Sequence, residues 1–264
     1  MTKQKRKKTI GDYLLSILLI AAIAVFLFAG YKLFTIYQEY KVGTDEYQQL
    51  EEMAVQKNPT DKDSSSDDSN VPEKIQPPIT VDFAALKAVN EDVVGWLYIE
   101  ALDISYPMVK GKDNDQYLHT TYEGTYNFAG SIFVDYENSD DFKDPNTNIY
   151  GHNMKNGSMF GTLNQIVTKN SYSTSPYFWI LTPTHNYRYA IFAAYTTQVS
   201  SDTYTLFKKH DKEYGEYLVS MKKKSEINTG ETTPVQTDNV VTLSTCTGNS
   251  ATRFVVQGVQ EPEF

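Results

Sequence analysis

The alternation of apolar and polar stretches divides the chain into three regions. The first region contains a long apolar run, Tyr13–Tyr31, with no charged residue, and Leu33–Ile36 extends it past Lys32. An α-helix rises about 1.5 Å per residue, so roughly 20 residues cross the hydrocarbon core of a bilayer. The pattern therefore predicts one N-terminal transmembrane helix over residues 13–36.

The charges beside this run predict its orientation. Lys3–Lys8 is strongly basic, and positive charge is retained on the cytoplasmic side of a membrane. Residues 1–12 are therefore expected to form a cytoplasmic tip, with the rest of the chain outside the cell. The alternative is a cleaved signal peptide, whose apolar region is usually about 7–15 residues long. The run here is longer, which favours an uncleaved anchor, although Ala21–Ala24 keeps cleavage open.

A polar region, residues 37–80, follows the apolar run. Tyr37–Gln56 has the composition of a short helix, whereas Asn58–Pro78 is rich in Asp and Ser and ends in prolines. Such a stretch buries too little apolar surface to offset the entropy lost on ordering. We expect an extracellular spacer that is partly disordered, and a folded domain over residues 81–264.

The third region has the pattern of a mainly β domain. Val81–Asn90 spaces its apolar residues as a short amphipathic helix does. Short runs of β-branched and aromatic residues separated by turns follow it, and they favour a β-barrel or sandwich. The expected strands are Gly95–Ile99, Ile104–Val109, Ser131–Asp135, Asn148–Tyr150, Tyr177–Leu181, Tyr187–Thr197, Asn239–Ser244 and Arg253–Val259. Thr182–Asn186 reads as a hairpin loop.

One segment between two late strands breaks the β pattern. Thr203–Ile227 is charged and spaces Leu206, Tyr214, Tyr217, Leu218 and Met221 along one helical face. A helix inserted there could form the rim of a site. A plain surface helix is the simpler interpretation and the one that the sequence favours.

Charge and cysteine content narrow the function. The formal net charge is −9, and residues 1–36 hold six basic residues and one acidic residue, so the remainder carries −14. An acidic domain is a poor candidate for binding nucleic acid, because nucleic acid binds to a basic face.

There is one cysteine, Cys246, so no intramolecular disulfide is possible. A lone thiol outside the cell is unusual unless it is buried or used.

Cys246 stands at the end of a predicted strand and just before the turn-like Thr247–Ser250. Rigid strand ends with an open loop beside them are favourable places for catalytic groups. Taken alone, a single cysteine is more often a buried residue that packs as a small hydrophobe. A nucleophilic role requires a neighbour that stabilises the thiolate.

Four histidines and one arginine bear on that requirement. His152 follows a predicted strand beside Gly151, whereas His119, His185 and His210 read as surface or structurally satisfied residues. Arg253 opens the strand after the Cys246 loop and returns near the thiol if the two strands pair. There it could donate to an oxyanion or hold a substrate carbonyl; the alternative is a salt bridge at a barrel rim.

These residues together resemble the sortase family. Thr242–Cys246 followed by Arg253 is similar to the TLxTC...R signature of sortases, and Tyr150–Asn153 is similar to their histidine motif. The resemblance covers about residues 81–260. Three further stretches and the helical insertion resemble class B sortases; the stretches are Asp92–Trp96, Gly111–Leu118 and Gly130–Tyr136.

The resemblance implies a closed β-barrel of about eight strands and a cysteine transpeptidase with endopeptidase activity. Cys246 would attack the Thr–Gly bond of a C-terminal sorting signal and form a thioacyl enzyme. His152 would protonate the leaving amine and deprotonate the incoming one, and Arg253 would stabilise the oxyanion or position the peptide. It also suggests four substrate-binding residues, namely Asn114, Leu118, Tyr150 and Ser244.

The same resemblance implies the partners. They are secreted proteins with a sorting signal and an amine, borne by a peptidoglycan precursor of the lipid II type. No cofactor is expected, and no metal site, because no pair of His or Cys has ligand spacing. Two alternatives stay open: a pilin polymerase that uses a Lys amine, and a membrane-tethered binding protein with an inactive site.

Overall fold

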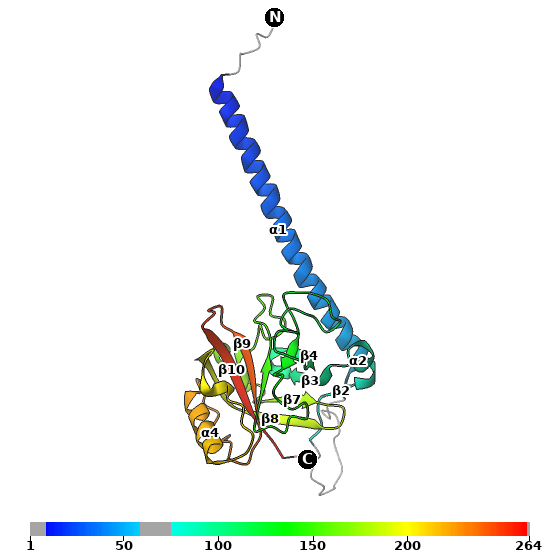
Figure 1. Cartoon of the computed structure of the whole chain (residues 1–264), viewed down its shortest axis with the longest axis vertical. Helices are drawn as coiled ribbons and strands as arrows, with labels where there is room; N and C mark the ends of the chain where they lie inside the picture. The colour runs from blue at the N-terminus through cyan, green and yellow to red at the C-terminus, as the bar shows by residue number, and fades with distance from the viewer. Residues whose placement is uncertain (1–8, 59–74, 263–264) are drawn as a thin grey trace, which may run out of the picture. The chain divides into compact units, whose positions relative to one another are not determined.

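The chain forms two compact units, Met1–Val42 and Gly43–Phe264. The computed structural model describes residues 9–58 and 75–262 (Figure 1). Helix α1, Ile10–Ala54, includes the predicted helix over 13–36. Among the described residues it is the one helix long and apolar enough to cross a membrane, with a mean hydropathy of 2.6 over its most apolar 18 residues, none of them buried. A membrane anchor and a signal sequence share these properties.

The second unit begins at Gly43, well before the predicted start at residue 81. Tyr47, Leu50 and Ala54 lie on one face of the last turns of α1 and are buried. The Tyr47 hydroxyl donates to the carbonyl of Gly130 at 2.7 Å. The expected spacer therefore contributes its first part to the core, because an i, i+3, i+7 spacing gives a short helix an apolar face.

The segments on either side of the predicted flexible stretch, Asn58–Pro78, pair with each other. Strand β1, Val55–Lys57, is antiparallel to β2, Ile79–Val81. The sequence did not predict this pair, because three-residue strands are too short to show alternation. Most of the predicted flexible stretch, Asn58–Pro78, falls on residues 59–74, which lie outside the described residues.

Eight further strands close into a barrel in the order β10-β8-β7-β3-β4-β5-β6-β9, so the predicted closed mainly β fold is confirmed (Figure 1). Each expected strand is present, with bounds that differ by a few residues. The strands are β3 Val93–Ile99, β4 Ile104–Val109, β5 Ile132–Val134, β6 Asn146–Tyr150, β7 Tyr177–Leu181, β8 Asn186–Gln198, β9 Val240–Cys246 and β10 Thr252–Gln260.

Short helices join the strands. Helix α2, Phe83–Val89, occupies the predicted position before β3, and the Asp82 side chain caps it by accepting from the backbone of Ala84 and Ala85. Strands β7 and β8 form the predicted hairpin, with Leu181 opposite Asn186. The remaining short elements are η1 Glu100–Leu102, α3 Gln165–Thr168, η2 Ser171–Ser173 and η3 Asp202–Tyr204.

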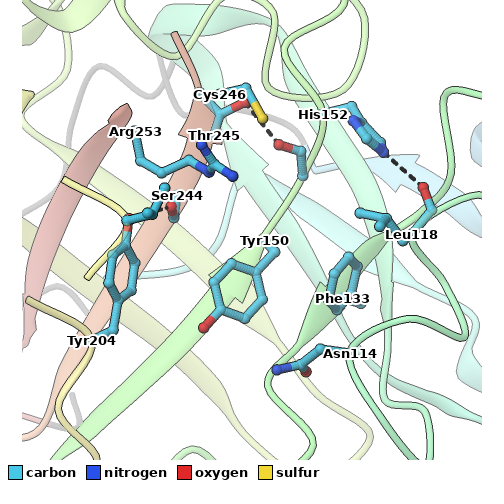
Figure 2. A pocket seen from close by; sticks show the side chains of 12 residues that line it. Asn114, Leu118, Phe133, Tyr150, His152, Tyr204, Ser244, Thr245, Cys246 and Arg253 are labelled. Carbon is cyan, nitrogen blue, oxygen red and sulfur yellow. Dashed lines mark hydrogen bonds between the residues drawn. The ribbon is translucent and has the colours of Figure 1, made fainter. Parts of the chain in front are cut away.

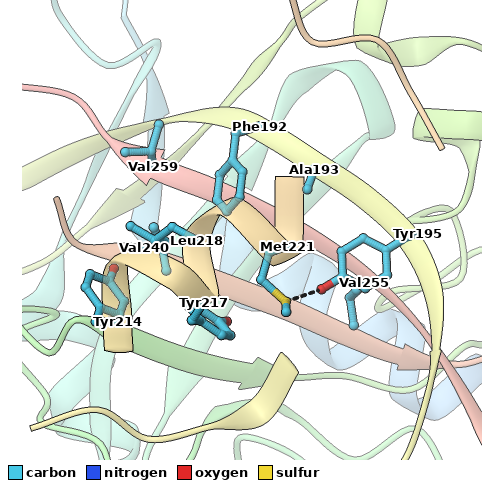
Figure 3. Close-up of a cluster of buried hydrophobic side chains, with 10 residues drawn as sticks. All are labelled: Phe192, Ala193, Tyr195, Tyr214, Tyr217, Leu218, Met221, Val240, Val255 and Val259. Carbon is cyan, nitrogen blue, oxygen red and sulfur yellow. Dashed lines mark hydrogen bonds between the residues drawn. The ribbon is translucent and has the colours of Figure 1, made fainter. Parts of the chain in front are cut away.

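The insertion before the Cys246 strand contains helix α4, Lys212–Lys224, and covers one face of the barrel. Its apolar side chains Tyr214, Tyr217, Leu218 and Met221 pack on β8, β9 and β10 (Figure 3). The Asp211 side chain caps its start by accepting from the backbone N–H of Tyr214. The helix is shorter than the 203–227 segment, because η3 and a loop take up the first residues.

One parallel pairing decides where the candidate catalytic residues meet. Strands β6 and β9 run parallel, with Tyr150 opposite Ser244. Parallel neighbours end at the same edge of a sheet. His152, two residues after β6, and Cys246, the last residue of β9, therefore lie at one end of the barrel although they are far apart in the sequence.

Candidate active site

Cys246 and Arg253 are paired residues on neighbouring antiparallel strands. Cys246 is the last residue of β9 and lies opposite Arg253, near the start of β10. Directly opposite residues in an antiparallel pair carry their side chains on the same face, with Cβ atoms about 4.5–5.5 Å apart. The predicted return of Arg253 to the thiol is thus a consequence of the strand register. The Cys246 side chain is free and partly exposed, unlike a buried structural cysteine.

The segment that carries His152 is bound to β9 by hydrogen bonds. The Gly151 amide donates to the Ser244 carbonyl at 3.2 Å, and the Thr245 hydroxyl donates to the Gly151 carbonyl at 2.8 Å. Residue 151 must be small, because an added Cβ would lie 2.4 Å from Ile132 Cδ1 and 2.8 Å from Phe160 Cδ2. These contacts fix the backbone from which His152 projects.

All seven residues expected in the site line one cavity of about 340 Å³. Figure 2 shows Cys246 between Arg253 and His152. The lining also includes residues that the sequence did not single out as functional. The full lining comprises Asn114, Leu118, Phe133, Tyr150, Gly151, His152, Val199, Tyr204, Ser244, Thr245, Cys246 and Arg253.

The backbone holds the Arg253 guanidinium in place. Its Nη1 donates to the carbonyls of Ser250 at 3.1 Å and Thr252 at 2.9 Å. These bonds occupy one corner of the planar group and leave its other N–H donors for a substrate oxygen. A fixed fork of donors beside a thiol is suited to an oxyanion or a peptide carbonyl.

The surroundings of His152 favour its neutral form. Burial lowers the pKa of His152, the hydrogen bond to Leu118 opposes this, and electrostatic interaction with His119 and Arg253 lowers the pKa further. Its Nε2 lies 2.7 Å from the Leu118 carbonyl oxygen, which can only accept, so Nε2 carries the hydrogen. Nδ1 is then the ring atom able to take a proton.

His119 stacks on His152, although its surroundings in the sequence predict no functional role for it. The two ring centroids are 5.4 Å apart and the planes differ by 16°. His119 is exposed and comes from the loop after Leu118. The contact between His119 and His152 exists only in the folded chain. The sequence around a single loop histidine therefore does not predict it.

A buried carboxylate holds the Asn114 and Tyr150 side chains. Asp135 accepts from Asn114 Nδ2 at 3.0 Å and from the Tyr150 hydroxyl at 2.8 Å. Burial, reinforced by Asp135, raises the pKa of Tyr150 far above its ordinary value, so the phenol stays neutral. The site thus offers an amide and a hydroxyl in fixed orientations for peptide recognition.

The helical insertion contributes a wall of the cavity. Tyr204, in η3, shares a hydrogen bond of 2.8 Å with the Ser244 hydroxyl, and Asn148 Nδ2 donates to the Tyr204 carbonyl at 3.2 Å. The simpler interpretation of this segment as a surface helix holds for α4, which gives no residue to the cavity, but not for Tyr204 in the part before it. Its α4 part packs on the barrel, and its first turn lines the cavity.

In the described parts of the chain, no three His, Cys, Asp or Glu side chains lie close enough together to hold a metal ion. The candidate chemistry is that of the thiol, the imidazole and the guanidinium. These are the groups that nucleophilic acyl transfer requires: a nucleophile, a proton carrier and an oxyanion donor.

Comparisons with known proteins identify the family. The sortase domain model matches residues 97–261. Sortase B of Listeria monocytogenes is 34% identical over 257 residues, which cover 94% of this chain and 97% of the relative. Sortase B of Staphylococcus aureus is 28% identical over 233 residues and 88% of each protein.

Solved structures agree with this match. The sortase B of Bacillus anthracis in complex with AAEK1 has a TM-score of 0.69 and 31% identity, covering 85% of this chain and 98% of that one. The sortase B of Clostridium perfringens has a TM-score of 0.64 and 31% identity, covering 69% and 100%. The barrel, the thiol motif and the relatives agree, and the chain belongs to the sortase family of transpeptidases, in class B.

Proposed function

We propose that this transpeptidase cleaves the Thr–Gly bond of a C-terminal sorting signal and transfers the new carboxyl end to an amine of a cell-wall precursor. The observation that carries the proposal is the meeting of Cys246, His152 and Arg253 in one cavity. Around them lie the polar groups of Asn114 and Tyr150, which suit an extended peptide.

The first half-reaction forms the thioacyl enzyme. Nδ1 of His152 takes the proton of the Cys246 thiol, and the resulting thiolate attacks the Thr carbonyl carbon while the Arg253 guanidinium donates to the oxyanion. The C–N bond then breaks, and the leaving amine takes a proton from His152. Leu118 and Ser244 line the same cavity and would contact the peptide on either side of the thiol.

The second half-reaction releases the product. An incoming amine gives a proton to the neutral His152 and attacks the thioester carbonyl. The C–S bond breaks, and Cys246 returns as the thiolate. The lowered pKa of His152 favours this step, because it keeps the imidazole in the form that accepts a proton.

We propose further that α1 anchors the enzyme as a single-pass protein, with residues 1–12 inside the cell and the barrel outside. The length and hydropathy of the helix support a span, and the basic residues 3–8 support the orientation. Tethering would raise the effective concentration of the enzyme near secreted substrates at the same surface.

The test is thioacyl formation by the full chain in detergent, using a library of sorting-type peptides and mass spectrometry of the intact protein. We expect an adduct on Cys246, and Cys246→Ala should abolish both adduct and cleavage while leaving the thermal unfolding midpoint nearly unchanged. His152→Ala and Arg253→Ala should each slow cleavage by about 10²–10³-fold or more. Substantial cleavage by Cys246→Ala would refute the mechanism.

Two acceptor amines are candidates for the second half-reaction. A peptidoglycan-type amine indicates cell-wall anchoring, whereas a pilin Lys amine indicates pilus assembly. Product analysis with both nucleophiles separates them, because the same thioacyl enzyme would give different conjugates. An inactive binding protein would give no adduct with any peptide.

A further inference from the structure

A second cavity of about 180 Å³ also reaches Cys246. It shares Thr245 and Cys246 with the cavity described above, and its other walls come from the loop between β6 and α3, from α3, β8 and β10, and from residues that follow α4 and β9. Its lining includes Asn153, Thr168, Thr196, Glu226 and Phe254. We call it the second cavity.

The two cavities lie on opposite faces of the same sheet. Side chains alternate between faces along a strand. Ser244 and Arg253 line the first cavity, whereas Phe254, the next residue of β10, lines the second. Strand β9 ends at Cys246, so no later residue of this strand separates the two cavities. Cys246 can therefore line both of them.

A transpeptidase needs two routes to its thioester. The acyl part of the peptide occupies one route, and the departing amine must leave by another. Attack by the incoming amine on this carbonyl is the reverse of the departure of the leaving amine. The incoming amine therefore approaches from the side on which the first amine left. The second cavity lies next to Cys246 and outside the cavity that carries Asn114 and Tyr150.

The two cavities differ in charge. The first contains the Arg253 guanidinium, whereas Glu226 is the one charged side chain among the residues lining the second. Glu226 is held in place by its own amide, which donates to Ala194 O at 2.8 Å, and by its Oε1, which accepts from Thr196 N at 2.8 Å. A fixed carboxylate of this kind attracts a cation.

The strand register gives the approximate separation of Thr196, whose amide binds this carboxylate, from Thr245, the residue before Cys246. Thr196, Phe254 and Thr245 lie opposite one another on β8, β10 and β9. Neighbouring strands are about 4.8 Å apart, so two spacings make about 10 Å. A reacting nitrogen must come within about 3–3.5 Å of the carbonyl. Glu226 therefore acts by attraction along the entry route and does not hold the reacting atom.

We propose that the second cavity admits the acceptor, a primary amine in its ammonium form, and that Glu226 attracts it. This inference rests on the proposed function. The ammonium passes Asn153, whose Nδ2 donates to the Cys246 carbonyl at 2.7 Å. It loses one proton to water, and the lone pair of the resulting neutral amine attacks the thioester carbonyl while His152 takes the second proton. The C–S bond breaks, and the Cys246 thiolate is restored.

The test measures what fraction of the thioacyl enzyme is hydrolysed by water and what fraction is transferred to an added amine. The full chain in detergent is given a sorting-type peptide with either triglycine amide, a cation, or hydroxylamine, which is neutral at the same pH. Across about 10 Å, Coulomb attraction changes affinity by about twofold to tenfold. Glu226→Gln should lower transfer to triglycine amide by that factor and leave hydrolysis and transfer to hydroxylamine unchanged.

Two controls make the result specific. Glu231→Gln removes an exposed carboxylate that lines neither cavity, and it should change nothing. Thr168→Trp places a large ring at the exposed edge of the second cavity and should reduce transfer to triglycine amide at least tenfold, whereas Lys169→Trp, one residue on, should not.

Each outcome decides the inference. The inference would be overturned if Glu226→Gln and Thr168→Trp both form the thioacyl enzyme normally and both transfer it to triglycine amide at the wild-type rate. The proposed function would then still stand. An equal loss with both nucleophiles in Glu226→Gln would overturn the role of its charge. Absence of any thioacyl adduct in the wild type would overturn the proposed function and this inference together.

Discussion

Replacing Arg253 with lysine separates the charge of this side chain from its shape. Lysine keeps the positive charge, but its three donors sit on one atom at the end of a flexible stem. In the structure, Nη1 of Arg253 already donates to the carbonyls of Ser250 and Thr252. A lysine that keeps those contacts has no second nitrogen with which to reach a substrate oxygen.

The size of the effect follows from the bond that is lost. A hydrogen bond to a charged group contributes about 1.5–3 kcal/mol, and 1.4 kcal/mol is a factor of ten. Arg253→Lys should therefore slow thioacyl formation by about 10- to 150-fold. Arg253→Ala also loses the charge and should cost about 10²–10³-fold, as removal of an oxyanion donor does.

The assay is single-turnover acylation, followed by quenching and mass spectrometry at saturating peptide. The rate of Cys246 alkylation by iodoacetamide reports on the thiol and should change little in Arg253→Lys. Arg188→Lys provides a matched control, because Arg188 forms an ion pair with Glu261 outside the site. Acylation of Arg253→Lys within threefold of the wild-type rate would refute the argument that the planar group is required.

Two further predictions concern the histidine pair and the barrel. His119→Ala should raise the pKa of His152, because it removes the electrostatic interaction with His119 and some burial, both of which lower that pKa. Transfer to amine needs neutral His152, so the acidic limb of its pH profile should move to higher pH; an NMR titration that shows no rise would contradict this. Gly258→Ala should destabilise the fold by about 1–3 kcal/mol in denaturant unfolding, because the new Cβ would lie 2.5 Å from Phe178 Cε1. Unfolding at the wild-type midpoint would show that the ring moves freely.

The strands of the barrel were predictable because each carries its own signal. Alternation and turn residues are local, and the β7–β8 hairpin and the Cys246–Arg253 pairing follow from neighbouring segments. The meeting of His152 with Cys246 needs the parallel β6–β9 pair, which no local pattern shows. The family resemblance supplied that part of the site.

The features that were missed depend on distant contacts. The burial of Tyr47 rests on its hydrogen bond to Gly130, far along the chain, so the start of the second unit could not be read from composition. Tyr204 enters the cavity because Asn148 and Ser244 bind it. His119 shows the same limit, since its stacking partner is defined by tertiary structure alone.

The parallel β6–β9 pair also has a consequence for the order of assembly. It joins Tyr150 to Ser244, and such distant contacts form late, because the entropy of closing the intervening loop must be offset first. Until that closure, Cys246 has no imidazole beside it, although the β9–β10 pair already places Arg253 opposite it. We expect the Cys246 thiol to have low reactivity while the chain is translocated and folds. It should become reactive only in the last step of barrel formation.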